Sequence, residues 1–232
     1  MKRRVMLKLS GEALSGNSGF GFDYDICDNY VKQIKKSLDN GVQVAIMVGG
    51  GNFIRGRSLV NIDKYRADEI GMLSTCMNTI FLAEVLRKNS IKTSMYGAFP
   101  YIDAIKLFSK YDAISDLENG KVVVIAGGTG HPYFTTDTGV VLRCLQLECD
   151  ELLLAKSIDG IYDKDPKKYN DAKKYDEITF EEMIEKKLLA IDLEGSIMGY
   201  ENSLKAQVFA LNDENSISRA MSGEKIGTII KN

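Results

Sequence analysis

The sequence predicts an α/β domain built on a mostly parallel sheet, and two observations carry this prediction. Short aliphatic and β-branched runs alternate with longer amphipathic stretches, which is typical of strand–helix–strand units. Several of these runs are apolar on consecutive residues, as strands are when helices cover both faces of the sheet. The predicted strands span residues 5–9, 42–48, 92–96, 122–126, 152–155, 207–211 and 228–230.

Four stretches between these strands have helical spacing of apolar residues: 26–40, 68–89, 136–147 and 179–187. The second of them repeats apolar residues along one helical face, which we expect to pack in the core. These residues are Ile70, Leu73, Met77, Ile80, Phe81 and Val85.

The composition is that of an ordinary globular protein of 232 residues, with 44% hydrophobic and 27% charged residues. There is no repeat, low-complexity tract or Ser/Gly-rich linker, so we expect residues 1–232 to form a single domain. A formal net charge of −2 indicates no nucleic-acid or membrane-surface partner. No apolar run approaches the roughly 18 residues of a membrane span, and no signal-peptide segment is recognisable, so we expect a cytoplasmic protein.

Cysteine and histidine are scarce, which narrows the chemistry. The four cysteines form no CxxC pair and His131 is the only histidine, so we expect reduced core thiols and no zinc site. Without further histidines, catalysis would depend on lysine, carboxylates, backbone NH groups and a supplied cation. This favours a reaction that needs little proton transfer.

Two predicted strands end in segments suited to phosphate. Residues 8–12 (KLSGE) place Lys8 near a strand tip with Ser10 and Gly11 just beyond, although a plain turn beside a surface lysine is the alternative. Residues 49–52 (GGGN) can curl backbone NH groups around an anion, or form a flexible loop. Neither a Walker A sequence nor a G-x-G-x-x-G spacing occurs, which disfavours P-loop and Rossmann folds.

The other two loops suit a nucleotide. Residues 127–137 (GGTGHPYFTTD) combine glycines, threonine hydroxyls and the start of a predicted helix. Helix capping would explain one residue of this run but not the whole run. Residues 156–166 hold turn signals around Tyr162, whose ring could stack on a base, although a solvated turn is the alternative. Together the four loops predict transfer between a nucleotide and a second anionic ligand.

These motifs, in this order and spacing, resemble the bacterial UMP kinases (uridylate kinases) of the amino acid kinase family over nearly the whole chain. The resemblance rests on residues 8–12, residues 49–52 with Arg55, Asp68 with residues 71–73, residues 129–137, and residues 159–166. It implies a three-layer αβα sandwich with a mostly parallel central sheet. It also implies phosphoryl transfer from ATP to UMP with Mg²⁺, in a cytoplasmic homohexamer that UTP inhibits and GTP affects.

The resemblance assigns roles by motif. Lys8 and Asp137 would be catalytic, with Lys8 stabilising the phosphoryl group in flight and Asp137 organising Lys8 or Mg²⁺. The residues implied to bind ATP are Lys8, Leu9, Ser10, Gly11, Gly51, Arg55, Lys156, Tyr162 and Asp165. The residues implied to bind UMP are Gly50, Asp68, Thr129, Gly130, His131, Pro132, Tyr133, Phe134, Thr135 and Thr136. Asp192 matches a further family carboxylate to which the resemblance gives no role.

Two departures from the family pattern stand out. His131 replaces a usual asparagine, which could alter the hydrogen bonds of its loop without abolishing UMP binding. Ser94 stands where GTP-activated members tend to carry arginine, which puts GTP activation in question. Two other readings stay open: a carbamate or amino acid kinase of the same fold, and a regulator that senses ATP or UTP and acts through a partner.

Overall fold

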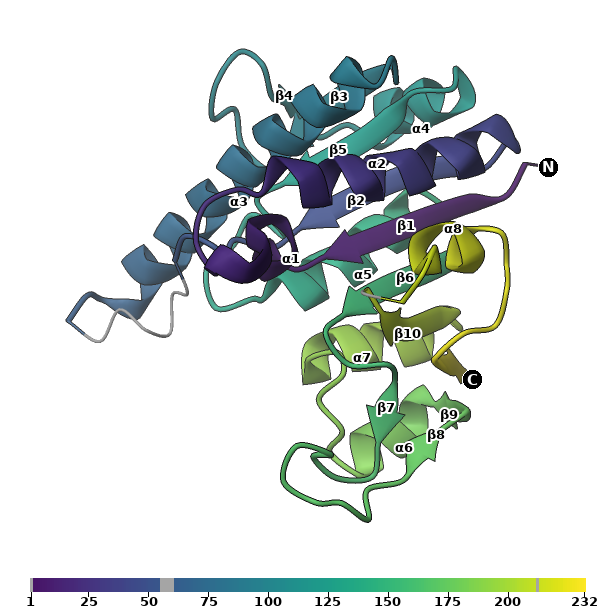
Figure 1. Cartoon of the computed structure of the whole chain (residues 1–232). Helices are drawn as coiled ribbons and strands as arrows, with labels where there is room; N and C mark the ends of the chain where they lie inside the picture. The colour runs from purple at the N-terminus through teal and green to yellow at the C-terminus, as the bar shows by residue number, and fades with distance from the viewer. Residues whose placement is uncertain (1, 55–60, 212) are drawn as a thin grey trace.

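The computed structural model describes residues 2–54, 61–211 and 213–232, and in these ranges the chain folds as alternating strands and helices (Figure 1). The strands are β1 (Arg4–Leu9), β2 (Gln43–Val48), β3 (Thr93–Gly97), β4 (Lys106–Leu107), β5 (Val122–Ala126), β6 (Glu151–Lys156), β7 (Ile161–Tyr162), β8 (Lys174–Tyr175), β9 (Glu177–Thr179), β10 (Ala206–Ala210) and β11 (Thr228–Lys231). The helices are α1 (Gly11–Ser15), α2 (Tyr24–Asp39), α3 (Lys64–Lys88), α4 (Lys110–Glu118), α5 (Thr136–Gln146), α6 (Phe180–Glu185), α7 (Leu193–Glu201) and α8 (Ser216–Met221), with a 3₁₀ turn at Gly16–Ser18.

Nine of the described strands form one sheet in the order β4-β3-β5-β2-β1-β6-β10-β11-β9. All neighbours in it are parallel except the antiparallel pair β10–β11, while β7 and β8 form a separate antiparallel hairpin. The seven predicted strands all occur with boundaries within one residue, and the prediction of a mostly parallel sheet is confirmed. The short strands β4, β7, β8 and β9 were not predicted.

Alternating residues of each central strand enter two separate hydrophobic clusters, so the molecule has three layers (Figure 1). In β1, Val5 and Leu7 pack with α1, α2, α3 and α8 on one face. Met6 packs with α4, α5, α6 and α7 on the opposite face. Because the central strands are covered on both sides, they are apolar on consecutive residues, and the αβα sandwich is confirmed.

Most of these helices begin at a polar side chain that accepts a hydrogen bond from the first turn. Such a side chain satisfies an NH group that has no partner inside the helix and so fixes where the helix starts. The capping residues are Ser10, Asp23, Asp63, Ser109, Thr135, Thr179 and Asp192.

The packing of α3 agrees with the prediction in part, since Val85 is buried and Ile80 and Phe81 pack against the core. Leu73 and Met77, which we expected in the core, are 51% and 43% exposed. The side of α3 that faces β2, β3 and β5 instead buries small, polar and aliphatic residues, among them Thr75 and Asn78. An 18-residue stretch of α3 reaches a mean hydropathy of 1.2, so by length and composition alone it could cross a membrane, but half of it is buried in the fold.

The free cysteines agree with the expectation of reduced thiols. Cys27, Cys76 and Cys144 are buried and Cys149 is half-buried, and none of the four forms a disulfide. Burial raises the pKa of Cys27 to about 12, which keeps that thiol protonated and unreactive at neutral pH.

A charged cluster joins α4 to the sheet. Asp116 accepts hydrogen bonds from Tyr96 Oη at 2.8 Å and Lys121 Nζ at 2.7 Å, and its side chain is 14% exposed. Burial acts to raise the pKa of Asp116, but the Lys121 ammonium and two hydroxyl donors overcome this and lower the pKa to about 2. The ionised carboxylate therefore favours the folded state.

The stabilisation by Asp116 should be complete above the unfolded-state pKa near 4 and should disappear as the pH falls from about 4 to about 2. We expect Asp116→Asn to lower the free energy of unfolding at pH 7 by about 1–2 kcal/mol, allowing for solvent screening. It should also flatten the dependence of stability on pH between 4 and 2. Urea unfolding at several pH values tests this, with exposed Asp103→Asn as the control. Parallel curves for wild type and Asp116→Asn would contradict the assignment.

Candidate active site

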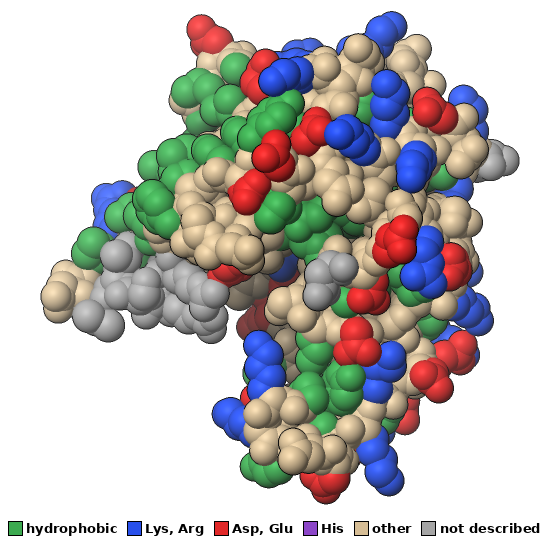
Figure 2. All heavy atoms as spheres, viewed as in Figure 1, with side chains coloured by type: hydrophobic (Ala, Val, Ile, Leu, Met, Phe, Trp, Pro, Cys, Tyr) green, Lys and Arg blue, Asp and Glu red, His purple; other side chains and the backbone are tan. Residues whose placement is uncertain are grey.

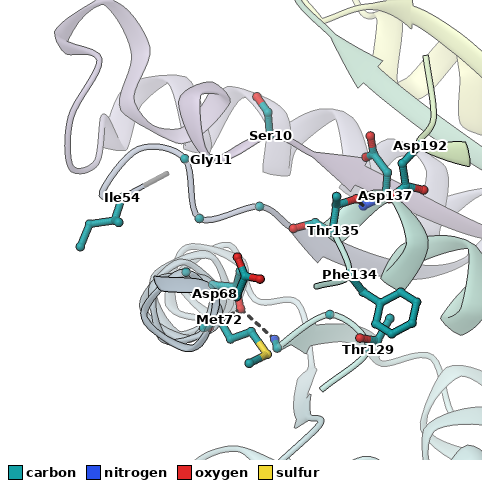
Figure 3. Close-up of a pocket in the computed structure, with 18 of the residues that line it drawn as sticks. Ser10, Gly11, Ile54, Asp68, Met72, Thr129, Phe134, Thr135, Asp137 and Asp192 are labelled. Carbon is teal, nitrogen blue, oxygen red and sulfur yellow. Dashed lines mark hydrogen bonds between the residues drawn. The ribbon is translucent and has the colours of Figure 1, made fainter. Parts of the chain in front are cut away.

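The loops that follow β1, β2 and β5 meet at the carboxyl edge of the sheet and enclose a cavity of about 630 Å³ (Figure 3). Parallel strands present their carboxyl ends at one edge, so loops distant in sequence come together there. The lining residues predicted from the sequence are Lys8, Ser10, Gly11, Gly50, Gly51, Asp68, Thr129, His131, Tyr133, Phe134, Thr135, Thr136 and Asp137. Arg55 lies outside the described residues.

Three charged side chains form the centre of this edge. Lys8 Nζ lies 2.9 Å from Asp137 Oδ1, and Lys156 Nζ lies 3.9 Å from Asp137 Oδ2. All three side chains are less than a quarter exposed. The lysines come from the adjacent strands β1 and β6, and the carboxylate comes from the first turn of α5. The sequence placed Lys156 among the ATP contacts but did not reveal its proximity to Asp137.

Burial and charge act in opposite directions on this cluster. Burial alone would raise the pKa of Asp137, but the charges of Lys8 and Lys156 hold it below its ordinary value, so the carboxylate is ionised at neutral pH. Burial lowers the pKa of Lys156, and the nearby charge of Lys8 adds to this, although Asp137 opposes both. The arrangement concentrates positive charge where an anion can enter.

The first two loops touch through their backbones. A Cβ atom added to Gly11 would lie 2.5 Å from Gly51 N and 2.8 Å from Asn52 N. Only glycine at position 11 allows this approach, which brings the NH groups of both loops to one wall of the cavity. Leu9 is buried in the core, and its carbonyl accepts the Gly49 NH at 3.0 Å. Leu9 can therefore contribute to a ligand only through its backbone.

Buried amide side chains fix the glycine loop after β2. Asn78 of α3 donates to Gly49 O at 2.6 Å, and Asn52 donates to Gly21 O at 2.8 Å. The two amides also exchange hydrogen bonds with each other at 2.7 and 2.9 Å. Asn78 was not predicted from the sequence, because it lies among other polar residues of α3, including Thr75 and Thr79, and no motif marks it.

The loop of residues 127–136 is held on three sides. Thr75 Oγ1 accepts the Gly127 NH at 2.8 Å, and the first turn of α5 packs so closely that a Cβ on Gly139 would lie 2.8 Å from Gly128 Cα. Asp68 Oδ2 accepts the Tyr133 NH at 2.8 Å, the bond drawn as a dashed line in Figure 3, and also pairs with Lys64 at 2.8 Å.

Aromatic side chains of this loop stay accessible at the mouth of the cavity. Tyr133 and Phe134 are 64% and 48% exposed, and His131 is exposed with its NH bonded to Thr129 Oγ1 at 3.1 Å. Gly130 and Pro132 shape the loop without lining the cavity.

The remaining ATP candidates lie elsewhere. Tyr162 ends β7, where its hydroxyl donates to Asp159 Oδ1 at 2.8 Å, and Asp165 accepts the Lys167 NH in the next turn at 3.0 Å. Neither residue lines the cavity around Lys8. The structure therefore brings most of the predicted phosphate and UMP residues around one cavity, and places Tyr162 and Asp165 on the segment after β6. Lys156 contacts Asp137 without lining the cavity itself.

One further residue of the cavity was noticed in the sequence without a role. Asp192 lies beside Asp137 and Thr135 (Figure 3) and caps α7 by accepting the Gly195 NH at 2.9 Å. Two threonine hydroxyls, those of Thr135 and Thr138, donate to its other oxygen.

No group of three or more His, Cys, Asp and Glu side chains within the described ranges is arranged to hold a metal ion alone. Mg²⁺ needs less than this, because it usually binds one or two carboxylates together with substrate phosphates and water. Asp137 Oδ1 is buried, and the contact that it makes is the ion pair with Lys8 at 2.9 Å. This carboxylate fits such a shared site.

An open αβα sheet with glycine loops and two largely buried lysines at its carboxyl edge is typical of proteins that bind phosphorylated ligands. The family model of the amino acid kinase family matches residues 3–206. The chain belongs to the amino acid kinase family.

Individual relatives agree with this family. A uridylate kinase of Rickettsia bellii (strain RML369-C) is 41% identical over 231 residues, which cover 99% of this chain and 97% of that protein. The crystal structure of a UMP kinase from Bacillus anthracis superposes with a TM-score of 0.94 at 30% identity, covering 99% of this chain and 96% of the other. A UMP kinase from Ureaplasma parvum gives 0.93 at 29% identity with both chains fully covered.

The close approach of the two glycine loops leads to a test. We expect Gly11→Ala to force the loops apart, because the new Cβ would meet backbone atoms that cannot rotate away. ATP affinity, measured by isothermal titration calorimetry, should fall at least about tenfold. Gly41→Ala is the control: it has open space but a φ of +82°, so it should cost about 1 kcal/mol of stability and leave ATP affinity unchanged. Equal ATP affinities for Gly11→Ala and wild type would refute the constraint.

Proposed function

We propose that this chain is a UMP kinase, which transfers the γ-phosphoryl group of ATP to UMP and forms ADP and UDP. The observation that carries the proposal is the largely buried Lys8–Asp137–Lys156 cluster, of which Lys8 and Asp137 line the cavity where the phosphate-suited loops and the loop of residues 127–136 meet. The 41% identity to a uridylate kinase over nearly the whole chain supports the choice of UMP as acceptor.

The proposed roles follow the positions of the side chains. Lys8 neutralises charge on the phosphoryl group in flight, and Lys156 adds a second positive charge 3.9 Å from Asp137. Ser10, Gly11, Gly51 and Arg55 surround the phosphates of ATP. Gly50, Asp68 and residues 129–136 hold UMP, with the Asp68 carboxylate accepting from ribose hydroxyls.

No general base is needed in this reaction. The phosphate of UMP has a second pKa of about 6, so it is mostly ionised at neutral pH and attacks without losing a proton to the protein. Positioning and fixed positive charge then account for the rate. This agrees with a cavity whose only histidine is the exposed His131.

Mg²⁺ bound to the ATP phosphates would neutralise the negative charge of the phosphoryl oxygens during transfer. Among the described residues, Asp137 is the side chain that would hold the cation or orient Lys8. Tyr162 and Asp165, together with Lys156, remain the proposed contacts of the adenosine moiety, on the loop that follows β6.

The remaining expectations also belong to this proposal: a cytoplasmic homohexamer in pyrimidine nucleotide biosynthesis, inhibited by UTP and responsive to GTP. Support for self-association comes from α3, where Leu73 and Met77 are exposed although apolar. Figure 2 shows hydrophobic side chains gathered over this helix. Such a patch favours burial against another copy of the chain.

A coupled ADP-release assay with ATP and Mg²⁺ tests the reaction. We expect rapid turnover with UMP and much slower turnover with CMP, dUMP, carbamate and aspartate, each compared with and without UTP and GTP. Preferred turnover of carbamate or aspartate would assign an acyl phosphate reaction instead. Nucleotide binding without turnover of any acceptor would identify a nucleotide-sensing regulator.

Lys8→Ala tests the central cluster. The variant should fold and bind nucleotide, but kcat should fall by about 10²- to 10³-fold because the charge opposite the transferred group is lost. Lys32→Ala, which removes an exposed lysine paired with Asp28 on α2, is the control and should keep wild-type turnover. Near-normal turnover of Lys8→Ala would exclude the assigned role.

A further inference from the structure

Asp192 has two carboxylate oxygens with separate partners. Oδ1 accepts the Gly195 NH at 2.9 Å and caps α7. Oδ2 accepts the hydroxyl of Thr138 at 2.6 Å and the hydroxyl of Thr135, both from α5 or its cap. One side chain therefore joins the beginnings of two helices at the edge of the cavity (Figure 3).

The bond to Thr135 reaches the catalytic cluster in one further step. Thr135 caps α5, and its hydroxyl oxygen accepts the Asp137 NH at 3.0 Å. A hydroxyl has a single proton, so donating it to Asp192 directs a lone pair towards Asp137. Asp192 thus selects the rotamer in which Thr135 caps the turn that carries Asp137.

The backbone around Asp192 contacts the same cluster from a second direction. The carbonyl of Ala190 accepts a hydrogen bond from Lys156 Nζ. On the other side, a Cβ on Gly195 would lie 3.5 Å from the carbonyl oxygen of Asp137, so the first turn of α7 packs directly on α5. The segment 190–195 thereby contacts both Lys156 and the turn that carries Asp137.

We propose that Asp192 is a positioning residue for phosphoryl transfer, which places Asp137 and Lys156 relative to Lys8 through Thr135 and the Ala190 carbonyl. The inference rests on the proposed function and extends it to a carboxylate that would not touch the reacting atoms. Three hydrogen bonds already occupy Asp192, out of about four lone-pair sites on a carboxylate, which leaves little capacity for a metal ion.

Asp192→Asn separates the two functions of this side chain. Asparagine caps helices as well as aspartate, so its oxygen continues to accept the Gly195 NH and α7 is retained. Its NH₂ group replaces Oδ2 and cannot accept the hydroxyls of Thr135 and Thr138. We expect kcat with ATP and UMP to fall about 10- to 100-fold, with both KM values changed less than about threefold and the unfolding temperature close to wild type.

A matched control and a second variant accompany this test. Asp23→Asn makes the same change at the cap of α2, where Asp23 accepts the Ile26 NH away from the cavity, and should leave kcat within about twofold. Thr138→Val removes one donor to Asp192 with little change in shape. In the double variant, kcat should fall by less than the product of the two single-variant decreases, because both changes break the bond between Thr138 and Asp192.

Hydrogen exchange provides a readout that needs no turnover. Amides in the first turn of α5 should exchange about tenfold faster in Asp192→Asn, or in Thr138→Val if the former does not fold, and at the wild-type rate in Asp23→Asn. Unchanged exchange in the folded variant would overturn the inference, as would a kcat within twofold of wild type. Recovery of kcat at high Mg²⁺ would overturn it too, because Asp192 would then be a metal ligand. Absence of UMP turnover in the wild type would instead count against the proposed function. Hydrogen exchange in the Asp192→Asn variant would still test the role of Asp192.

Discussion

Asp137 is enclosed between the ammonium groups of Lys8 and Lys156 at the carboxyl edge of the sheet. A buried carboxylate is stable only when nearby charges and hydrogen bonds compensate for lost hydration, and removing one partner leaves an unpaired charge. This requirement links three elements of the fold. The adjacent strands β1 and β6 must deliver the lysines side by side, and α5 must begin where its first turn meets them.

The same cluster explains why the edge suits phosphate. Two ammonium groups share one carboxylate, and the pKa of Lys156 is lowered by burial and by the charge of Lys8. An anion that enters beside them relieves this repulsion and replaces lost hydration, so binding and charge compensation are coupled. The close contact between the two glycine loops also brings their backbones to the wall of the same cavity.

Sequence reasoning predicted the sheet and the candidate loops because both depend on local patterns. Strands covered on both faces are apolar on consecutive residues, and the loops after them share one edge whatever the details of packing. It could not predict α1, α4, α7 or α8, each of which has nine residues or fewer and so too short an apolar pattern. Nor could it place Lys156 beside Asp137, because that proximity depends on the pairing of β1 with β6, whose partner residues are 146 positions apart in the chain, and on the docking of α5.

The inner side of α3 shows how the site alters core packing. The inner side of this helix uses Thr75 to accept the Gly127 NH and Asn78 to hold Gly49, so it supports two loops of the cavity at once. A Cβ on Gly50 would lie 2.8 Å from the Gly71 carbonyl, which shows how closely the loop rests on the helix. Polar and small residues are needed on that side for these contacts. Leu73 and Met77 therefore lie on the outer face, although periodicity alone assigned them to the core, while Leu82, Val85 and Leu86 of the same helix stay buried.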